Sequence, residues 1–245
     1  MSKEVAKAAS KEVAQAQNLA DWGEQELSSQ DILISKILPM QGLSKMVTER
    51  KAQMGEYRDS VTAALHGSVD APMEFLPFHM KRSWSVSKMV NGKYVYQREE
   101  QMTRENEGRQ WEENVGGEQF RNVYTYTFFA LLPKEIAKGG AMPYMLSFSS
   151  TSVKAGKKLA TQMFVRNKNE GLTPASYVMH LDGQITKNDK GSFIVRDVSL
   201  GRKATDEEVT KALEFFKIVR SGAVKEDHSD REPAPRTNGA DNMEF

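Results

Sequence analysis

Apolar residues alternate with polar ones, or form short apolar runs, along several stretches of this chain, which is typical of β-strands. These stretches are bounded by turn-forming residues and cover 72–88, 122–132, 144–148, 175–181 and 192–198. Residues 122–132 are the densest in aromatic and β-branched side chains, so we expect a central strand there. The pattern therefore predicts a β-rich domain.

A hairpin and two helices complete the predicted order of elements. Asn91-Gly92 offers residues that accept a positive φ, which predicts a tight turn into a returning strand at 94–96. From Ser149 to Phe164 the apolar spacing becomes helical, and Ser152 or its neighbour can cap that helix. A capping-box pattern at 205–208 precedes a closing helix. Without the hairpin, the order is strand, strand, strand, helix, strand, strand.

This order predicts an α+β fold rich in β-structure. A helix between the third and fourth of five strands is the arrangement of the oligonucleotide-binding (OB) barrel, here with an elaborating hairpin and a C-terminal helix. We expect a flexible extension at 1–30, the domain at 31–220 and a disordered acidic tail at 221–245. The polar segment 99–117 contains Trp111 and is expected to be a long exposed loop.

Composition excludes several classes of protein. The chain has 245 residues, 39% of them hydrophobic, and no cysteine, which rules out disulfides, thiol nucleophiles and cysteine zinc sites. No apolar run approaches the roughly 20 residues of a membrane span, and the first residues lack the form of a signal peptide. We therefore expect a soluble protein of the cytoplasm.

Charge is unevenly distributed along the chain. Met142 to Lys203 holds ten Lys/Arg against four Asp/Glu, whereas Glu226 to Phe245 holds two Arg against six Asp/Glu. A basic body followed by an acidic tail favours a polyanion as partner of the body and a protein as partner of the tail.

Single-stranded nucleic acid needs Lys or Arg for its phosphates and flat side chains for its unpaired bases. Basic residues lie beside aromatic ones in the predicted hairpin, and lysines crowd one end of the first helix. The expected nucleic-acid contacts are Lys81, Arg82, Trp84, Lys93, Tyr94, Tyr96, Arg98, Lys154, Lys157, Lys158, Arg166 and Lys168. The residues expected to bind a partner protein through the tail are Asp241, Met243, Glu244 and Phe245.

Several segments together resemble bacteriophage single-stranded DNA-binding proteins of the OB-barrel type. They are 74–84, 144–151 leading into Lys157-Lys158-Leu159, 188–191, and the terminal Phe245 among acidic residues. The tail departs from the family habit because it contains Arg231 and Arg236 and lacks a dense Asp run. The resemblance implies a cytoplasmic protein of the infected host cell that coats and protects single-stranded DNA during replication and recombination. It implies neither bond chemistry nor a cofactor, metal or membrane; homo-oligomers are compatible with it.

Other interpretations stay open. Strand aromatics also serve as core, helix lysines also form ordinary solvated faces, and a charged tail also serves solubility alone. The enzyme classes lack a motif, because Gly156-Lys157 fails the phosphate-loop pattern and the four His residues are scattered without metal-ligand spacing. The alternatives are a structural or assembly protein of the virion and an RNA-binding module.

Overall fold

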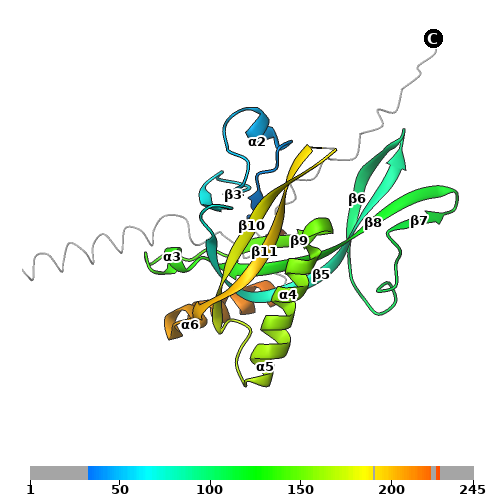
Figure 1. The fold of residues 1–245 in the computed structure, drawn as a ribbon. Coiled ribbons are helices and arrows are strands. Elements are labelled where there is room, and N and C mark those ends of the chain that lie inside the picture. The colour runs from blue at the N-terminus through cyan, green and yellow to red at the C-terminus, as the bar shows by residue number, and fades with distance from the viewer. Residues whose placement is uncertain (1–32, 190, 222–224, 227–245) are drawn as a thin grey trace, which may run out of the picture.

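The computed structural model describes residues 33–189, 191–221 and 225–226. Helices cover both faces of an antiparallel sheet, and a small three-stranded sheet lies at one end (Figure 1). The elements are β1 (Leu33–Ile34), β2 (Ile37–Pro39), α2 (Lys45–Thr48), β3 (Glu56–Asp59), β4 (Leu65–Ser68), β5 (Met73–Val90), β6 (Lys93–Gln101), β7 (Glu112–Val115), β8 (Glu118–Leu131), α3 (Pro133–Ile136), β9 (Tyr144–Ser149), the 3-10 turn η2 (Ser150–Ser152), α4 (Val153–Thr161), the π-helical turn η3 (Gln162–Arg166), α5 (Asn167–Asn169), β10 (Tyr177–Asn188), β11 (Gly191–Lys203), α6 (Asp206–Arg220) and β12 (Lys225–Glu226).

Two long antiparallel strands, β5 and β8, form the centre of a seven-stranded sheet. They pair from Leu76 opposite Leu131 to Lys88 opposite Phe120. The other edge of β5 is shared, because β10 pairs with its beginning and β6 with its end. The other edge of β8 is shared in the same way by β7 and β9. As a result, β6 and β7 flank the ends of β5 and β8 to form an arm that projects from the body (Figure 1).

The alternation of side chains along β8 divides the hydrophobic core into two layers. Phe128 and Ala130 pack on the side covered by α4, whereas Phe129 and Leu131 pack on the side covered by α6. All four are at most 2% exposed. This confirms the predicted central strand, since a strand with two buried faces has to be apolar on both.

The predicted turn at Asn91-Gly92 is confirmed. Asn91 has φ 51° and Gly92 has φ 77°, and the pair joins β5 to β6 where Val90 lies opposite Lys93. Positive φ at both central residues matches the right-handed twist of the two strands, which is why Asn and Gly favour this connection.

The predicted barrel is not confirmed, because the main sheet is open. Its path runs from β11 to β7, and among the described residues no ladder joins these two ends. Closure would require hydrogen bonding between the outer edges of the sheet, because a closed barrel leaves no strand edge free. The structure thus supports a β-rich fold with antiparallel sheets, and it does not support a closed barrel.

Several boundaries differ from the sequence prediction. The strands predicted at 175–181 and 192–198 are parts of a longer β10–β11 hairpin. Both ends of the polar segment 99–117 are strands, so the exposed loop is shorter, at 102–111. The α4 helix continues through the π-helical turn η3 to Asn169. The extension at 1–30 and nearly all of the acidic tail lie outside the described residues.

Candidate functional site

The beginning of α4 borders a pocket lined by aromatic side chains. The pocket has a volume of about 280 Å³ and lies between α4, β8 and the end of the 102–111 loop. We call it the aromatic pocket, and its lining residues are Trp84, Trp111, Asn122, Tyr124, Ser150, Val153 and Lys157.

Helix α4 lies close to the sheet because of a glycine. A Cβ atom built on Gly156 would lie 3.0 Å from the Cβ of Phe148 and 3.0 Å from the Tyr126 ring. Most Cβ contacts are longer than this, so a larger residue would push the helix outward. Gly156 therefore sets the distance between Lys157 and the rings of β8.

The aromatic rings differ in how much surface they offer. Trp111 is 50% exposed, Tyr124 is partly buried, and Trp84 is only 7% exposed. The Tyr124 ring centre lies 5.4 Å from that of Trp84 and 4.8 Å from that of Tyr126. Tyr126 and Phe128 then continue the row into the core. Trp111 and Tyr124 are thus the rings best placed to meet a ligand.

Trp84 and Asn122 fasten the 102–111 loop to the sheet. The indole Nε1 of Trp84 donates a hydrogen bond to the carbonyl oxygen of Asn106 at 3.0 Å. The side-chain amide of Asn122, which is 1% exposed, donates to the carbonyl oxygen of Gln110 at 2.9 Å. Its backbone N–H donates to the carbonyl of Trp111 at 2.8 Å. Burial and these contacts give Trp84 a positioning role at the pocket.

Ser150 has φ 48°, in the left-handed region that residues other than glycine rarely adopt. It lines the aromatic pocket at the junction of β9 and η2. Such backbone conformations cost roughly 1–3 kcal/mol and cluster at ligand sites. The strained turn therefore marks this junction as a candidate site.

Most of the predicted cationic contacts in the arm already have an acidic partner. Lys81 is 3.2 Å from Glu99, and Arg82 is 3.5 Å from Glu107. These pairs, together with Arg98 beside Glu100 at 2.6 Å, neutralise charge that the sequence assigned to phosphates.

Tyr94 and Tyr96 also have partners in the arm. Arg121 lies over the Tyr94 ring, 3.7 Å from its centre, and the Tyr94 hydroxyl is 3.1 Å from a carboxylate oxygen of Glu112. Tyr96 is partly buried and has contacts of its own.

Fewer of the predicted cations between α4 and α5 have an acidic partner than in the arm. Lys158 pairs with Asp197 at 3.1 Å, and Arg166 contacts the side chain of Gln162 at 3.5 Å. Within the part of the chain that the structure describes, the predicted cations that make no ion pair are Lys93, Lys154, Lys157, Arg166 and Lys168. Four of these five belong to the helix that runs from α4 to α5.

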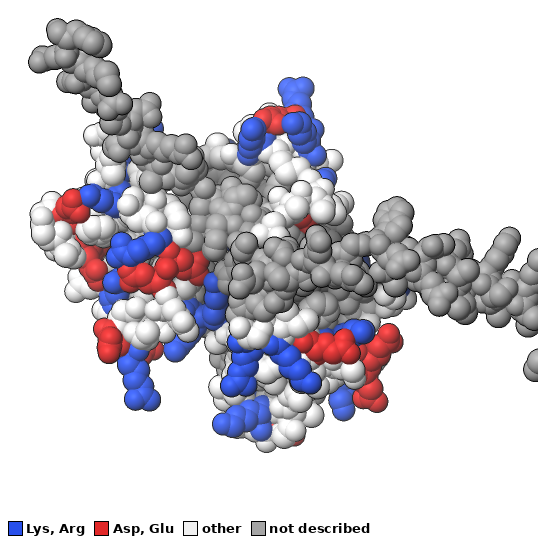
Figure 2. All heavy atoms as spheres, turned by 180° about the vertical axis from the view of Figure 1, so that it is seen from behind, with Lys and Arg blue, Asp and Glu red and all other residues white. Residues whose placement is uncertain are grey.

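Figure 2 shows the same division of charge from behind. Basic and acidic side chains are interspersed over the arm, at the left of that view. At the lower end of the molecule, where Figure 1 places α5, the coloured side chains are mainly basic. Uncompensated positive charge thus gathers toward this helix.

The sequence interpretation missed Tyr124 and Asn122 as pocket residues and named Trp111 only as part of a loop. Trp111 carried a usable signal, because a large aromatic residue in a very polar segment has no core to enter. Tyr124 carried none, since it shares its strand face with core aromatics.

The described residues contain no group of three or more His, Cys, Asp or Glu side chains that could hold a metal ion. Within the same residues, no helix has the length and apolar character needed to cross a bilayer.

Comparison with known proteins gives a family and no closer relative. No curated protein and no solved structure matches the chain. One family model, described as Pam3 phage gp34-like protein, matches residues 3–225, which is most of the chain. The chain therefore belongs to the family of Pam3 phage gp34-like proteins.

Proposed function

We propose that this phage-family protein binds single-stranded DNA without altering its bonds. The observation that carries the proposal is the aromatic pocket, where the exposed Trp111 and the partly buried Tyr124 lie beside Lys157. Unpaired bases stack on such rings, and a lysine without an acidic partner is available to a phosphate.

The energetics suit a non-specific binder. Each stacked base contributes roughly 1–3 kcal/mol, and every base has a flat face, so stacking tolerates any sequence. Phosphate contacts add affinity that falls as salt rises, because binding releases counterions. An open sheet with a helix beside it offers these contacts as well as a closed OB barrel does.

The biological role that we attach to this binding is the coating and protection of single-stranded DNA during phage replication and recombination. It would operate in the cytoplasm of the infected cell. The tail residues named above, which lie outside the described part of the chain, would then recruit a replication or recombination protein. That part of the proposal rests on the acidic composition of the tail alone.

Fluorescence anisotropy of a labelled single-stranded oligonucleotide, with duplex DNA of equal length as competitor, tests the proposal. We expect preference for the single strand and weakening of the affinity by about fivefold to 150-fold in Trp111→Ala, the range for one lost stacking contact. Lys157→Ala should lower the salt dependence of binding by about 0.7 in the logarithmic slope, the value for one phosphate contact.

Two exposed residues outside the pocket provide controls, Val115→Ala in the arm and Lys138→Ala after α3. Both variants should bind as the unmodified protein does. No binding at low salt would refute the proposal, and equal losses in control and pocket variants would remove the pocket from it.

A role in virion assembly is the second candidate, favoured by a different observation. In the described sheet, β6 pairs only with β5 and β11 only with β10, so each has an edge able to accept a strand from another copy. Such a protein would form stable higher oligomers without nucleic acid, which sedimentation velocity detects. RNA as the natural ligand would show in competition between matched RNA and DNA strands.

A further inference from the structure

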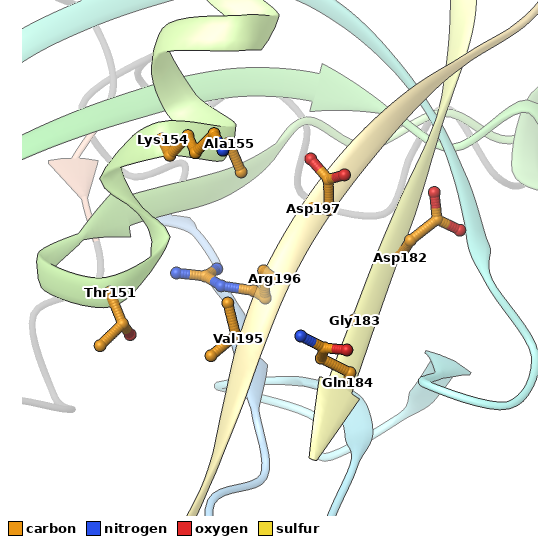
Figure 3. Close-up of a pocket in the computed structure, with 9 residues that line it drawn as sticks. All are labelled: Thr151, Lys154, Ala155, Asp182, Gly183, Gln184, Val195, Arg196 and Asp197. Atoms are coloured by element: carbon orange, nitrogen blue, oxygen red, sulfur yellow. The ribbon is translucent and has the colours of Figure 1, made fainter. Parts of the chain in front are cut away.

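A second pocket lies on the other side of the beginning of α4, against the β10–β11 hairpin (Figure 3). It has a volume of about 390 Å³. We call it the cationic pocket, and its lining residues are Thr151, Lys154, Ala155, Asp182, Gly183, Gln184, Val195, Arg196 and Asp197.

Arg196 occupies a core position of its strand. Its neighbours on the same strand face, Ile194 and Val198, are at most 1% exposed, and Arg196 itself is 9% exposed. Charged residues are almost never so buried unless they are paired. An arginine at an inward position therefore calls for an explanation beyond packing.

The contacts of the Arg196 guanidinium use neutral groups. Its Nε donates to the hydroxyl of Ser152 at 3.4 Å, and Nη2 donates to the carbonyl oxygen of Ser147. The group also lies over Phe148, 4.6 Å from the ring centre. Within the described residues it forms no ion pair, and a guanidinium carries more N–H donors than these contacts use.

Burial makes this unpaired charge costly. It lowers the pKa of Arg196 to about 10, which still leaves the side chain protonated near neutral pH. A buried cation without a carboxylate is destabilising unless an anion compensates it. Because Arg196 lines a pocket that opens to solvent, a ligand can supply that anion.

The rest of the pocket is consistent with an anionic ligand. Lys154 is exposed and makes no ion pair within the described residues, and Thr151 adds a hydroxyl. The two acidic residues have partners of their own. Asp197 pairs with Lys158 and also interacts electrostatically with Lys154, and Asp182 accepts a hydrogen bond from Ser199 at 2.6 Å. With Lys158 included, three cations face two carboxylates.

We propose that the cationic pocket binds a phosphate group, held by Arg196 and Lys154. The forked guanidinium donors match the geometry of phosphate oxygens, and the lysine adds a point charge. The phosphate would come either from a free nucleotide or from a nucleic-acid strand. The second source rests on the proposed function, because Ser150 of the aromatic pocket directly precedes Thr151 of the cationic pocket.

Isothermal titration calorimetry with inorganic phosphate, with a nucleoside monophosphate and with a single-stranded oligonucleotide tests the proposal on the full chain. We expect at least one probe to bind, and Lys154→Ala to weaken its binding about tenfold, as for the loss of one charge-assisted contact. Arg196→Lys keeps the charge but loses the fork, and should weaken binding at least as much. Lys138→Ala, an exposed lysine after α3 that lines neither pocket, is the control and should change nothing.

The probes separate the two sources. Binding of the monophosphate that depends on Lys154 but survives Trp111→Ala supports a free nucleotide, whether or not the protein binds DNA. Binding of the oligonucleotide alone, weakened by both variants, supports a strand phosphate. If Arg196→Lys does not fold, Lys154→Ala decides the question. Equal affinities of Lys154→Ala, Lys138→Ala and the unmodified protein for every probe would overturn the proposal, even if the oligonucleotide were bound through the aromatic pocket. Absence of binding by all three probes would overturn it as well.

Discussion

Glu208 is the carboxylate at which a helix cap and an ion pair meet. It accepts a hydrogen bond from the backbone N–H of Thr205 at 2.8 Å, and the Thr205 hydroxyl accepts from the Glu208 backbone in return. Both terminal nitrogens of Arg202 also donate to it, at 2.8 and 2.6 Å. The hydrogen bonding from Arg202 holds the pKa of Glu208 below its ordinary value of 4.5.

Replacement of this carboxylate by an amide tests its contribution. We expect Glu208→Gln to lower the free energy of unfolding by about 1.5–3 kcal/mol near neutral pH, the range for hydrogen bonds to charged groups. A carboxylate whose pKa is lower in the folded state stabilises fully above its unfolded pKa and loses this effect as pH falls through the folded pKa. The difference from the unmodified protein should therefore shrink below pH 4.5.

Urea denaturation at several pH values measures this difference. Glu207→Gln, an exposed position in the same first turn, is the matched control and should change stability by less than about 0.5 kcal/mol. A deficit in Glu208→Gln that stays constant from neutral to acidic pH would contradict the assignment.

At the scale of residues, local patterns in the sequence correctly predicted a helix cap and a turn. The capping box of Thr205 and Glu208 and the turn at Asn91-Gly92 depend on neighbours in sequence, and both are confirmed. Ser152 is a residue for which the local sequence pattern predicted the wrong hydrogen bond. It is the N-cap of α4 without capping through its side chain, and its hydroxyl instead accepts from Arg196, which is distant in sequence.

At the scale of elements, the indole of Trp84 is one of the groups that attach the 102–111 loop to the sheet. Trp84→Phe keeps a large ring but removes the donor to Asn106, which should cost about 0.5–1.5 kcal/mol. We expect faster amide hydrogen exchange in this loop, with little change in β8. Trp111→Phe is the control, because its indole N–H has no hydrogen bond within the described residues, and exchange there should stay as in the unmodified protein. Equal exchange in the two variants would contradict this attachment.

The position of α4 depends on Gly156 in a comparable way. Gly156→Val would place methyl groups against Phe148 and Tyr126, and overpacking of this kind costs about 1–3 kcal/mol. Because α4 borders both pockets, the variant should also weaken any ligand bound in either. Gly108→Val is the control, since nothing lies within 4 Å of a Cβ at that position. Thermal unfolding compares the stability of the two variants. Equal melting temperatures would contradict the prediction, because they would show that α4 and the sheet move apart without loss of stability.

Periodicity predicted these elements well because it records which face of a strand or helix is buried. The strand at 122–132, the hairpin and the helix after Ser149 all have counterparts in the structure. Strand lengths were underestimated where apolar alternation gives way to polar residues. In β10 and β11 the ladder continues through exposed polar positions to Asn188 and Gly191, where the signal for burial is lost.

At the scale of the whole molecule, the pairing of the strands could not be predicted from the sequence. The order of elements is shared by the OB barrel and by this open sheet, and no local residue pattern records that β6 and β10 lie on one edge of β5. Arg196 was missed for a related reason, although its place between Ile194 and Val198 was a visible break in an apolar face. Counting charged residues along the sequence also did not reveal ion pairs between distant residues, such as Lys158 with Asp197.

The continuity of β5 and β8 has a mechanical consequence. Each strand runs without interruption from the body into the arm, so the arm has no linker about which to swing. The 18 residues of β5 span roughly 60 Å at the usual rise per residue. A force applied at the tip of the arm would therefore bend the part of the sheet that lies beneath α4. Because both pockets border that helix, this bending would change their shape.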